Sequence, residues 1–183
     1  MRYPADQKAE TRNHIVKTAS TQLRKHGVNG IGVAQLMKSA GLTHGGFYAH
    51  FESKDTLISE AIDAAFDQTM VALEQATAAT SPGQRKKAII HAYVSKKHRD
   101  NPGSGCAIAA LGPDVSRLDA KTRRRFEARV AALIEMIAGA DDEASRKDAI
   151  VTLSAMVGGL VLARAVRSEA LSTEIVEALQ TSL

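Results

Sequence analysis

Apolar residues recur along this chain at the spacing of helices rather than at the spacing of strands. Within residues 118–139, Phe126, Val130, Leu133 and Ile137 fall three or four positions apart, which places them on one face of a helix. Other segments show the same period, and none alternates cleanly between apolar and polar residues. We therefore predict an all-α fold of about nine helices with no sheet.

Small and polar residues mark the expected ends of these helices. Gly27, Gly41 and Gly139 each follow a periodic segment, where glycine commonly ends a helix. Polar residues that precede such segments are predicted N-caps, namely Thr43, Ser53, Asp141 and Ser172. A further helix is expected to continue to about Arg99, with Ser81 as its cap, Pro82 as its first residue and Gln84 as its capping-box partner.

Composition indicates an ordinary soluble protein. The chain has 183 residues, of which 44% are hydrophobic and 24% charged, enough for one or two domains with a buried core. The single cysteine allows no disulfide within one chain, which is typical of a reducing compartment. No apolar run of membrane-spanning length is evident, and the N-terminus is polar, so we expect a cytoplasmic protein without membrane contact. We also expect no metal and no cofactor.

The positive charge is concentrated in the first third of the chain. Residues 1–57 hold eight Lys or Arg against four Asp or Glu, and the remaining chain is balanced at sixteen of each, so the net charge of +4 arises entirely in this segment. Four of the seven Phe and Tyr residues also lie there. A basic N-terminal module beside a neutral body indicates an anionic partner, with nucleic acid favoured over membrane.

The segment VAQLMKSAGLTHGGFYAHF, residues 33–51, has the pattern of a helix-turn-helix. It comprises two short helical stretches around a glycine turn at Gly41, and the second stretch begins with small and polar residues. In such modules the second helix enters the major groove with its N-terminal residues at the base edges. Thr43 and His44 occupy that end.

The adjacent glycines Gly45 and Gly46 are unexpected inside a helix. Each costs about 1 kcal/mol relative to alanine in a helix interior. They either mark a helix boundary or allow the backbone to come close to DNA, and we favour the second interpretation.

The stretch AGLTHGGFYAHFESKDTL, residues 40–57, strongly resembles the DNA-binding domain of the tetracycline-repressor (TetR) family of transcriptional regulators. The motif-level resemblance covers about residues 10–60, and helix count and length agree over the rest. It implies a three-helix DNA-binding domain at residues 1–52 and a helical effector-binding and dimerisation domain at residues 53–183.

The resemblance also implies roles for individual residues. Thr43, His44, Gly45 and Gly46 correspond to positions that approach bases, and Phe47 and Phe51 would anchor the recognition helix in the core. The positions that contact phosphates correspond to Tyr48, His50 and Lys54, although Tyr48 as a core residue is nearly as well supported.

The chain departs from the family pattern at Gly32, where members commonly have Ser or Thr, and at Ala34, where a basic or polar residue is frequent. Phosphate contacts from this helix therefore have less support. Lys8, Arg12 and Gln35 are the nearby alternatives.

The C-terminal part supplies candidates for an effector pocket and a dimer interface. The predicted pocket residues come from the apolar faces of the middle helices: Phe66, Met70, Tyr93, Cys106, Ile108, Leu111, Phe126 and Met156. The helix around residues 149–163 is apolar on nearly every side, which favours a four-helix interface with a second subunit over a central helix of a monomer. The predicted interface residues are Met156, Gly158, Gly159, Val161, Ile175, Val176 and Leu179.

Cys106 lies at a predicted helix start, where the helix dipole would lower its pKa and favour a redox or electrophile sensor. A small buried cysteine is the more frequent case. A His91–His98–Cys106 metal site, or one at His44 and His50, has weaker support because the spacings match no common pattern. The cluster Arg123, Arg124, Arg125 and Arg129 is interpreted as a solvated face rather than an anion site.

The sequence therefore predicts a ligand-responsive transcriptional regulator, most simply a repressor that binds a palindromic DNA operator as a homodimer and is released by a small molecule. Two alternatives are an architectural DNA-binding protein without an effector and, with less support, a small all-helical enzyme. No nucleophile–base pair or phosphate-binding glycine loop is evident, so we expect no enzyme.

Overall fold

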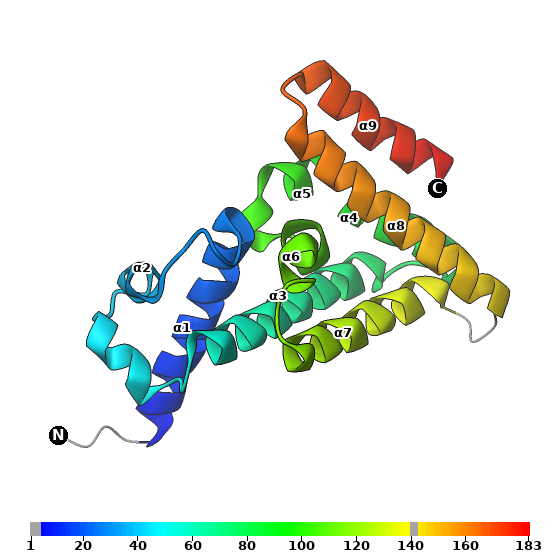
Figure 1. Ribbon diagram of the computed structural model, residues 1–183. Coiled ribbons are helices and arrows are strands. Elements are labelled where there is room, and N and C mark those ends of the chain that lie inside the picture. Colours follow the sequence, from blue (N-terminus) through cyan, green and yellow to red (C-terminus); the bar gives the residue numbers. More distant parts are fainter. Residues whose placement is uncertain (1–4, 140–142) are drawn as a thin grey trace.

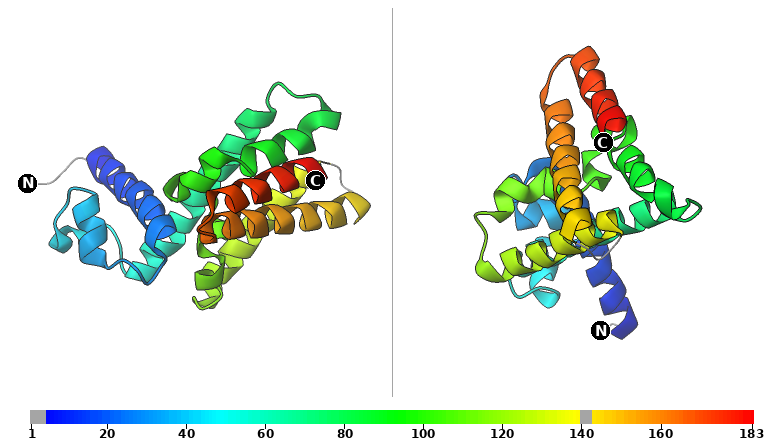
Figure 2. Two further views of the ribbon diagram at one scale, coloured as in Figure 1. Left: turned by 90° about the horizontal axis from the view of Figure 1, so that it is seen from above. Right: turned by 90° about the vertical axis from the view of Figure 1, so that its right-hand side faces the viewer.

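A small helical unit at one end of the molecule adjoins a larger helical body (Figures 1 and 2). The computed structural model describes residues 5–139 and 143–183, and every regular element within these ranges is helical, which confirms the all-α prediction. The described elements are α1 (Ala5–His26), α2 (Val33–Ser39), the 3₁₀ helix η1 (His44–Ala49), α3 (Lys54–Thr77), α4 (Pro82–Tyr93), α5 (Lys96–Asp100), the 3₁₀ helix η2 (Pro102–Ser104), α6 (Ala107–Val115), α7 (Ala120–Ala138), α8 (Glu143–Ala165) and α9 (Glu169–Ser182).

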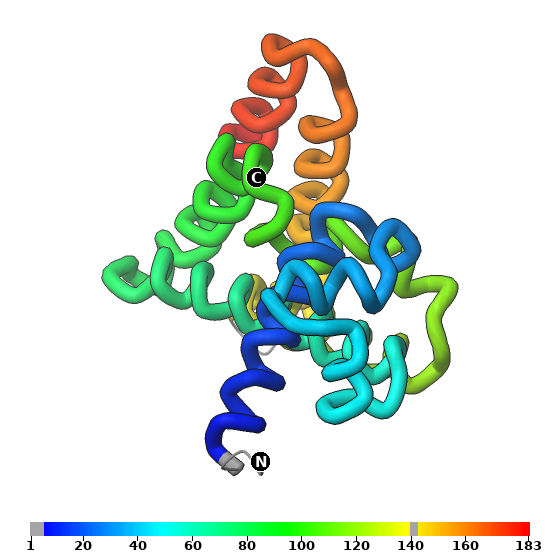
Figure 3. Tube along the Cα trace, turned by 90° about the vertical axis from the view of Figure 1, so that its left-hand side faces the viewer, coloured from blue at the N-terminus to red at the C-terminus, as the bar shows by residue number. Residues whose placement is uncertain are grey.

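The small unit consists of α1, α2 and η1, and α1 packs along α3 (Figure 3). Its buried core includes Leu23 of α1, Met37 of α2 and Phe47 of η1. The same core continues through the N-terminal half of α3 and into α6, where Leu111 and Val115 join it. The first hydrophobic core therefore extends past residue 52, and the division at 52/53 stays a prediction.

A second core holds the body together. It lies among α4, α7, α8 and α9, with buried side chains that include Ile90, Leu133, Met156 and Val176. Helix α8 packs against α7 on one side and α9 on another (Figure 1). This leaves one face of α8, which includes Val151, Val161 and Leu162, uncovered by the described parts of the chain.

Several predicted helix ends are confirmed. Gly27, Gly41 and Gly139 have φ of +75°, +71° and +67°, in the left-handed region that favours glycine after a helix. The Ser53 hydroxyl accepts a hydrogen bond from the Thr56 backbone N–H at 3.1 Å and caps α3.

The predicted start of the last helix is wrong. Ser168, rather than Ser172, caps α9, and its side chain accepts from the Leu171 N–H at 3.3 Å. Ser172 lies inside α9 and is buried, with its hydroxyl donating to the Ala163 carbonyl at 2.7 Å and accepting from Arg99 at 2.9 Å. These buried partners hold α9 against α8 and α5. The predicted cap Asp141 lies outside the described residues.

The helix predicted to reach Arg99 ends earlier, at Tyr93. Val94 leaves helical geometry with φ −88° and ψ +80°, and Ser95 then caps the separate helix α5 by accepting from the His98 N–H. Ser81 precedes α4 with Pro82 as first residue, as expected, but its side chain makes no capping hydrogen bond. Because the helix breaks at residues 94–95, the chain that follows turns back beside Tyr93.

Helix α8 corrects the expectation that no apolar run is long enough to cross a membrane. Its length and composition alone would allow it to span one. Its contacts with α6, α7 and α9 are those of a core helix, and 39% of its most apolar window is buried inside the chain.

Candidate nucleic-acid interface and a cavity in the helical body

The predicted recognition helix is a 3₁₀ helix, η1, rather than an α-helix. Thr43 precedes it in extended conformation and makes no side-chain capping bond. Phe47 is buried and stacks on Phe51 with ring centroids 5.6 Å apart, which anchors η1 in the first core. On the opposite side His44 is exposed and Tyr48 is 69% exposed, so Tyr48 is not a core residue.

Neither Gly45 nor Gly46 is required by the fold of the free protein. Neither has a positive φ. A Cβ atom built on Gly45 would meet nothing within 4 Å, and one on Gly46 would make ordinary contacts with Thr43 Oγ1 at 3.7 Å and Met37 Cε at 3.8 Å. Packing and backbone conformation therefore leave the paired glycines unexplained, whereas close approach of another molecule would explain them.

The residues predicted to contact phosphates differ in their availability. Lys8 and Gln35 are exposed. The Lys54 ammonium donates to the Val28 carbonyl at 3.2 Å, which holds the α1–α2 loop. His50 is half-buried, and burial, followed by the nearby charges of Lys8 and Arg12, lowers its pKa.

Arg12 already has partners within the free protein, and its predicted contact with DNA stays a prediction. Its two terminal nitrogens bond both carboxylate oxygens of Glu60 at 2.5 and 2.6 Å, and its guanidinium lies 4.5 Å from the centre of the Phe51 ring. Its Nε also donates to the His50 carbonyl at 3.2 Å. Arg12 therefore joins α1 to α3 and to the end of η1.

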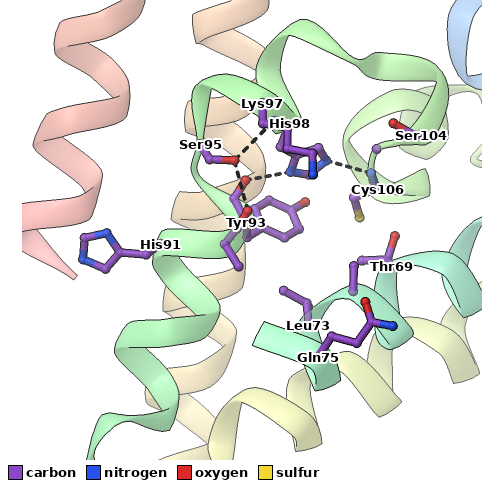
Figure 4. Close-up of a pocket in the computed structure, with 13 residues that line it drawn as sticks. Thr69, Leu73, Gln75, His91, Tyr93, Ser95, Lys97, His98, Ser104 and Cys106 are labelled. Atoms are coloured by element: carbon purple, nitrogen blue, oxygen red, sulfur yellow. Dashed lines mark hydrogen bonds between the residues drawn. The ribbon is translucent and has the colours of Figure 1, made fainter. Parts of the chain in front are cut away.

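A cavity of about 460 Å³ lies between the C-terminal half of α3, the end of α4 and the loop leading into α6 (Figure 4). Its volume is in the range usual for small-molecule sites, about 300–1,000 Å³. The residues that line it are Thr69, Ala72, Leu73, Gln75, His91, Ala92, Tyr93, Ser95, Lys97, His98, Ser104, Gly105 and Cys106.

Only Tyr93 and Cys106 of the predicted pocket residues line this cavity. Phe66 packs edge-on against Phe126 at 5.2 Å in the first core, where Leu111 is also buried. Met156 is buried in the second core. The remaining two, Met70 and Ile108, are partly buried against these cores. The prediction selected apolar faces, and most of these faces fill the cores instead.

The His98 ring forms part of the cavity wall and is held on both sides by backbone groups (Figure 4). Its Nδ1 lies 2.6 Å from the Tyr93 carbonyl oxygen, and its Nε2 lies 2.8 Å from the Cys106 backbone nitrogen. Because a carbonyl only accepts and an N–H only donates, the ring is neutral with its proton on Nδ1. Burial lowers the His98 pKa to about 4.

We expect His98 to make the fold sensitive to acid. Its pKa in the unfolded chain is near 6.5, above the folded value of about 4, so below pH 6.5 the unfolded state binds a proton that the folded state does not. Stability contributed by His98 should be complete above pH 6.5 and decrease by about 3 kcal/mol as the pH falls to 4. Urea unfolding of the wild type and of His98→Asn at pH 4.5, 5.5 and 7.5 measures this difference. Parallel losses in the two proteins would show that His98 is not responsible.

Cys106 does not have the environment predicted for a reactive thiol. It is the N-cap of α6, and its sulfur accepts from the Ile108 N–H at 3.4 Å. However, the thiol is buried, and burial raises its pKa rather than lowering it. The alternative His91–His98–Cys106 metal site is also contradicted, because both nitrogens of His98 already have backbone partners.

The predicted dimer interface divides into an inward and an outward set. Met156 and Val176 are buried within the subunit, and Gly159 faces its own α9, where an added Cβ would lie 1.9 Å from Leu179 Cδ1. Packing between α8 and α9 of one chain accounts for these positions, and Ile175 and Leu179 are partly buried there. Their part in a dimer interface stays a prediction. Gly158, with open space beside it, and Val161 lie on the outward face.

Part of the arginine cluster on α7 has partners on α3. Arg125 and Arg129 form ion pairs with Asp63, and Arg129 also pairs with Asp67 at 2.7 Å. Arg123 and Arg124 are exposed. These contacts favour a structural and solvated role over an anion site.

The sequence interpretation missed three residues, of which Arg24 and Asp114 link the small unit to the body and Arg164 joins α8 to α5 within the body. Arg24, near the end of α1, donates to the Gly105 carbonyl at 2.6 Å and to Gln68 Oε1 at 2.6 Å. Asp114 of α6 accepts from the Val28 N–H at 2.9 Å. Arg164 of α8 donates to the carbonyls of His98 and Arg99. Arg24 is indistinguishable in the sequence from the solvated basic residues that often end a helix, and its burial appears only in the fold.

An exposed helix-turn-helix face joined to a helical body is the architecture of a DNA-binding transcriptional regulator. A family model for bacterial regulatory proteins of the tetR family matches residues 15–61. This segment of the chain therefore matches the DNA-binding part of the TetR family of transcriptional regulators. Members are non-enzymatic transcription factors that bind operator DNA and small-molecule effectors, typically as dimers.

Similar proteins support the assignment along different lengths of the chain. The HTH-type transcriptional regulator AcrR of Shigella flexneri is 39% identical over 51 residues, 28% of this chain and 24% of that protein. The HTH-type transcriptional repressor KstR2 of Rhodococcus jostii (strain RHA1) is 25% identical over 123 residues, 66% of this chain and 59% of that protein. Both matches thus span less than two thirds of these relatives.

The fold is shared along nearly the whole chain with solved structures. A TetR transcriptional regulator from Chloroflexus aurantiacus J-10-FL superposes with a TM-score of 0.81 and 21% identity, over 96% of this chain and 95% of that one.

Proposed function

We propose that this protein is a cytoplasmic repressor that binds a palindromic operator as a homodimer and is released when a small molecule occupies the cavity beside Tyr93 and His98. The observation that carries the proposal is the connection between that cavity and α1. Gly105 lines the cavity, and its carbonyl accepts directly from Arg24 of α1. An effector that moved this wall would therefore also displace the helix that supports η1.

A second contact runs parallel to the first. Helix α6 begins at the cavity beside Cys106, and Asp114 near its other end holds the Val28 N–H just after α1. Effectors act by binding one of two arrangements more tightly. A shift of α6 and α1 would alter the separation of the two η1 elements in a dimer, which must match half-sites about 34–36 Å apart.

The cavity also bears on the alternative of an architectural DNA-binding protein. Such a protein needs no small-molecule site, whereas a cavity of about 460 Å³ connected to α1 suits a sensor. We therefore favour the effector-responsive regulator.

Selection of binding sites from random duplex DNA tests the DNA-binding part of the proposal. We expect enrichment of a palindromic sequence, with binding that weakens steeply between 50 and 200 mM salt because phosphate contacts release counterions. His44→Ala should change sequence preference, and Lys8→Ala should weaken all sequences about equally. Failure to enrich any sequence, together with salt-insensitive binding, would refute the proposal.

A further inference from the structure

The wall of the cavity is backed by two cations, the buried Arg24 and the half-buried Arg164, that have no carboxylate partner among the described residues. Arg24 is 4% exposed and bonds only neutral acceptors, the Ser20 carbonyl, the Gly105 carbonyl and the amide oxygen of Gln68. Arg164 bonds the carbonyls of His98 and Arg99. Buried charges in proteins are normally paired, because an uncompensated charge is costly away from water.

Both guanidinium groups converge on one residue of the cavity lining. Arg24 Nη1 is 2.6 Å from the Gly105 oxygen, and a Cβ built on Gly105 would lie 2.9 Å from Arg164 Nη2. Gly105 therefore lies between the two guanidinium groups and the cavity. Burial lowers the pKa of Arg24 to about 10, so it remains charged at neutral pH.

The cavity lining itself carries the positive side chain of Lys97 and no acidic side chain. No Asp or Glu is among the lining residues. The nearby acids Asp100 and Glu169 are paired with Arg99. The electrostatic field in the cavity is therefore positive from the Gly105 wall and from Lys97.

A buried hydroxyl inside this field also lacks a strong partner. The Tyr93 hydroxyl is inaccessible to solvent and has no nitrogen or oxygen partner among the described residues. Figure 4 shows its ring beneath His98, with the hydroxyl end directed toward the Cys106 thiol, a weak hydrogen-bonding group. Burial raises the Tyr93 pKa, so the group is a neutral donor. Leu73, Ala72 and Ala92 supply apolar surface nearby.

We propose that the effector is a small organic anion, a carboxylate on an apolar body, whose charge compensates Arg24 and Arg164 and whose oxygen accepts a hydrogen bond from Tyr93. This inference rests on the proposed function and names the chemical class of its ligand. The apolar body would lie against Leu73 and the α4 end, with the carboxylate toward the Gly105 wall.

Calorimetric titration of the full chain at pH 7.5 tests the ligand class with matched probes. Octanoate and 3-phenylpropanoate are compared with their primary amides and with the corresponding amines. We expect at least one carboxylate to bind at least tenfold more tightly than its amide, and the amines not to bind. Equal or tighter binding of an amide or amine, or no binding of either carboxylate at millimolar concentration, would overturn the proposal.

Gln68→Glu provides a variant of nearly unchanged shape that supplies the missing carboxylate to Arg24. We expect it to weaken carboxylate binding about tenfold and to leave amide binding unchanged, whereas Tyr93→Phe should weaken the carboxylate by a similar factor. Unchanged carboxylate affinity in Gln68→Glu would contradict the role of Arg24. Circular dichroism confirms that both variants are folded.

The two proposals fail separately. If a carboxylate binds but the operator complex stays intact, then release through this site is refuted, whereas the proposed chemical class of the ligand stands. If a neutral molecule releases the operator, and this release is lost in Tyr93→Phe, then the proposed regulatory function stands and the proposal of an anionic effector is refuted.

Discussion

Leu162→Glu is expected to convert the proposed dimer to a monomer and to reduce operator affinity by at least about 100-fold. Leu162 is 58% exposed on the outward face of α8, which Val151 and Val161 share at 65% and 42% exposure. Leu171 of α9 is 43% exposed. Contiguous apolar surface of this kind marks an interaction site, and a symmetric pairing of α8 and α9 would cover it.

A glutamate in the middle of that surface would have to be buried without a partner, which costs several kcal/mol. The monomer would then bind one half-site and lose the gain from the second. Sedimentation equilibrium gives the oligomeric state, and fluorescence anisotropy with the selected operator gives the affinity.

Val71→Glu is the matched control, because Val71 is 48% exposed on α3 rather than on the α8 face. We expect this variant to remain dimeric and to bind the operator normally. A dimeric Leu162→Glu protein would place the subunit interface elsewhere.

The helices were predictable from the sequence because each carries a local signal. These signals are the helical spacing of apolar residues, a glycine in the left-handed region after the helix, and a capping serine before it. They act within a few residues of one another, as Ser53 does for α3. The prediction of a helix end was wrong where a polar residue makes tertiary contacts instead of capping a helix. Ser172 resembles a cap, yet its hydroxyl is used in the buried junction with Ala163 and Arg99.

The DNA-binding residues and the cavity differ in how far the sequence could define them. The η1 positions belong to one continuous segment, so the resemblance could be carried residue by residue. The cavity forms where α3, α4 and the loop before α6 meet, and its wall depends on Arg24 from α1. The helical spacing of apolar residues identifies buried side chains such as Phe66 and Met156. It does not distinguish side chains that fill a core from side chains that line a cavity.

Gly45→Ala is expected to leave the free protein at least as stable as the wild type and to weaken operator binding at least tenfold. The methyl group meets nothing within 4 Å in the free protein, and replacing glycine in a helix interior adds up to about 1 kcal/mol of stability. Tenfold weaker binding corresponds to about 1.4 kcal/mol. The loss would arise because the methyl group keeps the η1 backbone away from the groove.

Urea unfolding and operator binding, measured on the same preparation, separate the two effects. Gly83→Ala is the matched control, since its added methyl group also meets nothing within 4 Å but lies at the start of α4, outside the DNA-binding unit. It should alter neither the affinity nor the sequence preference. Normal operator affinity in Gly45→Ala would show that the glycine does not serve close approach to DNA, and readout would then rest on Thr43, His44 and Tyr48 without it.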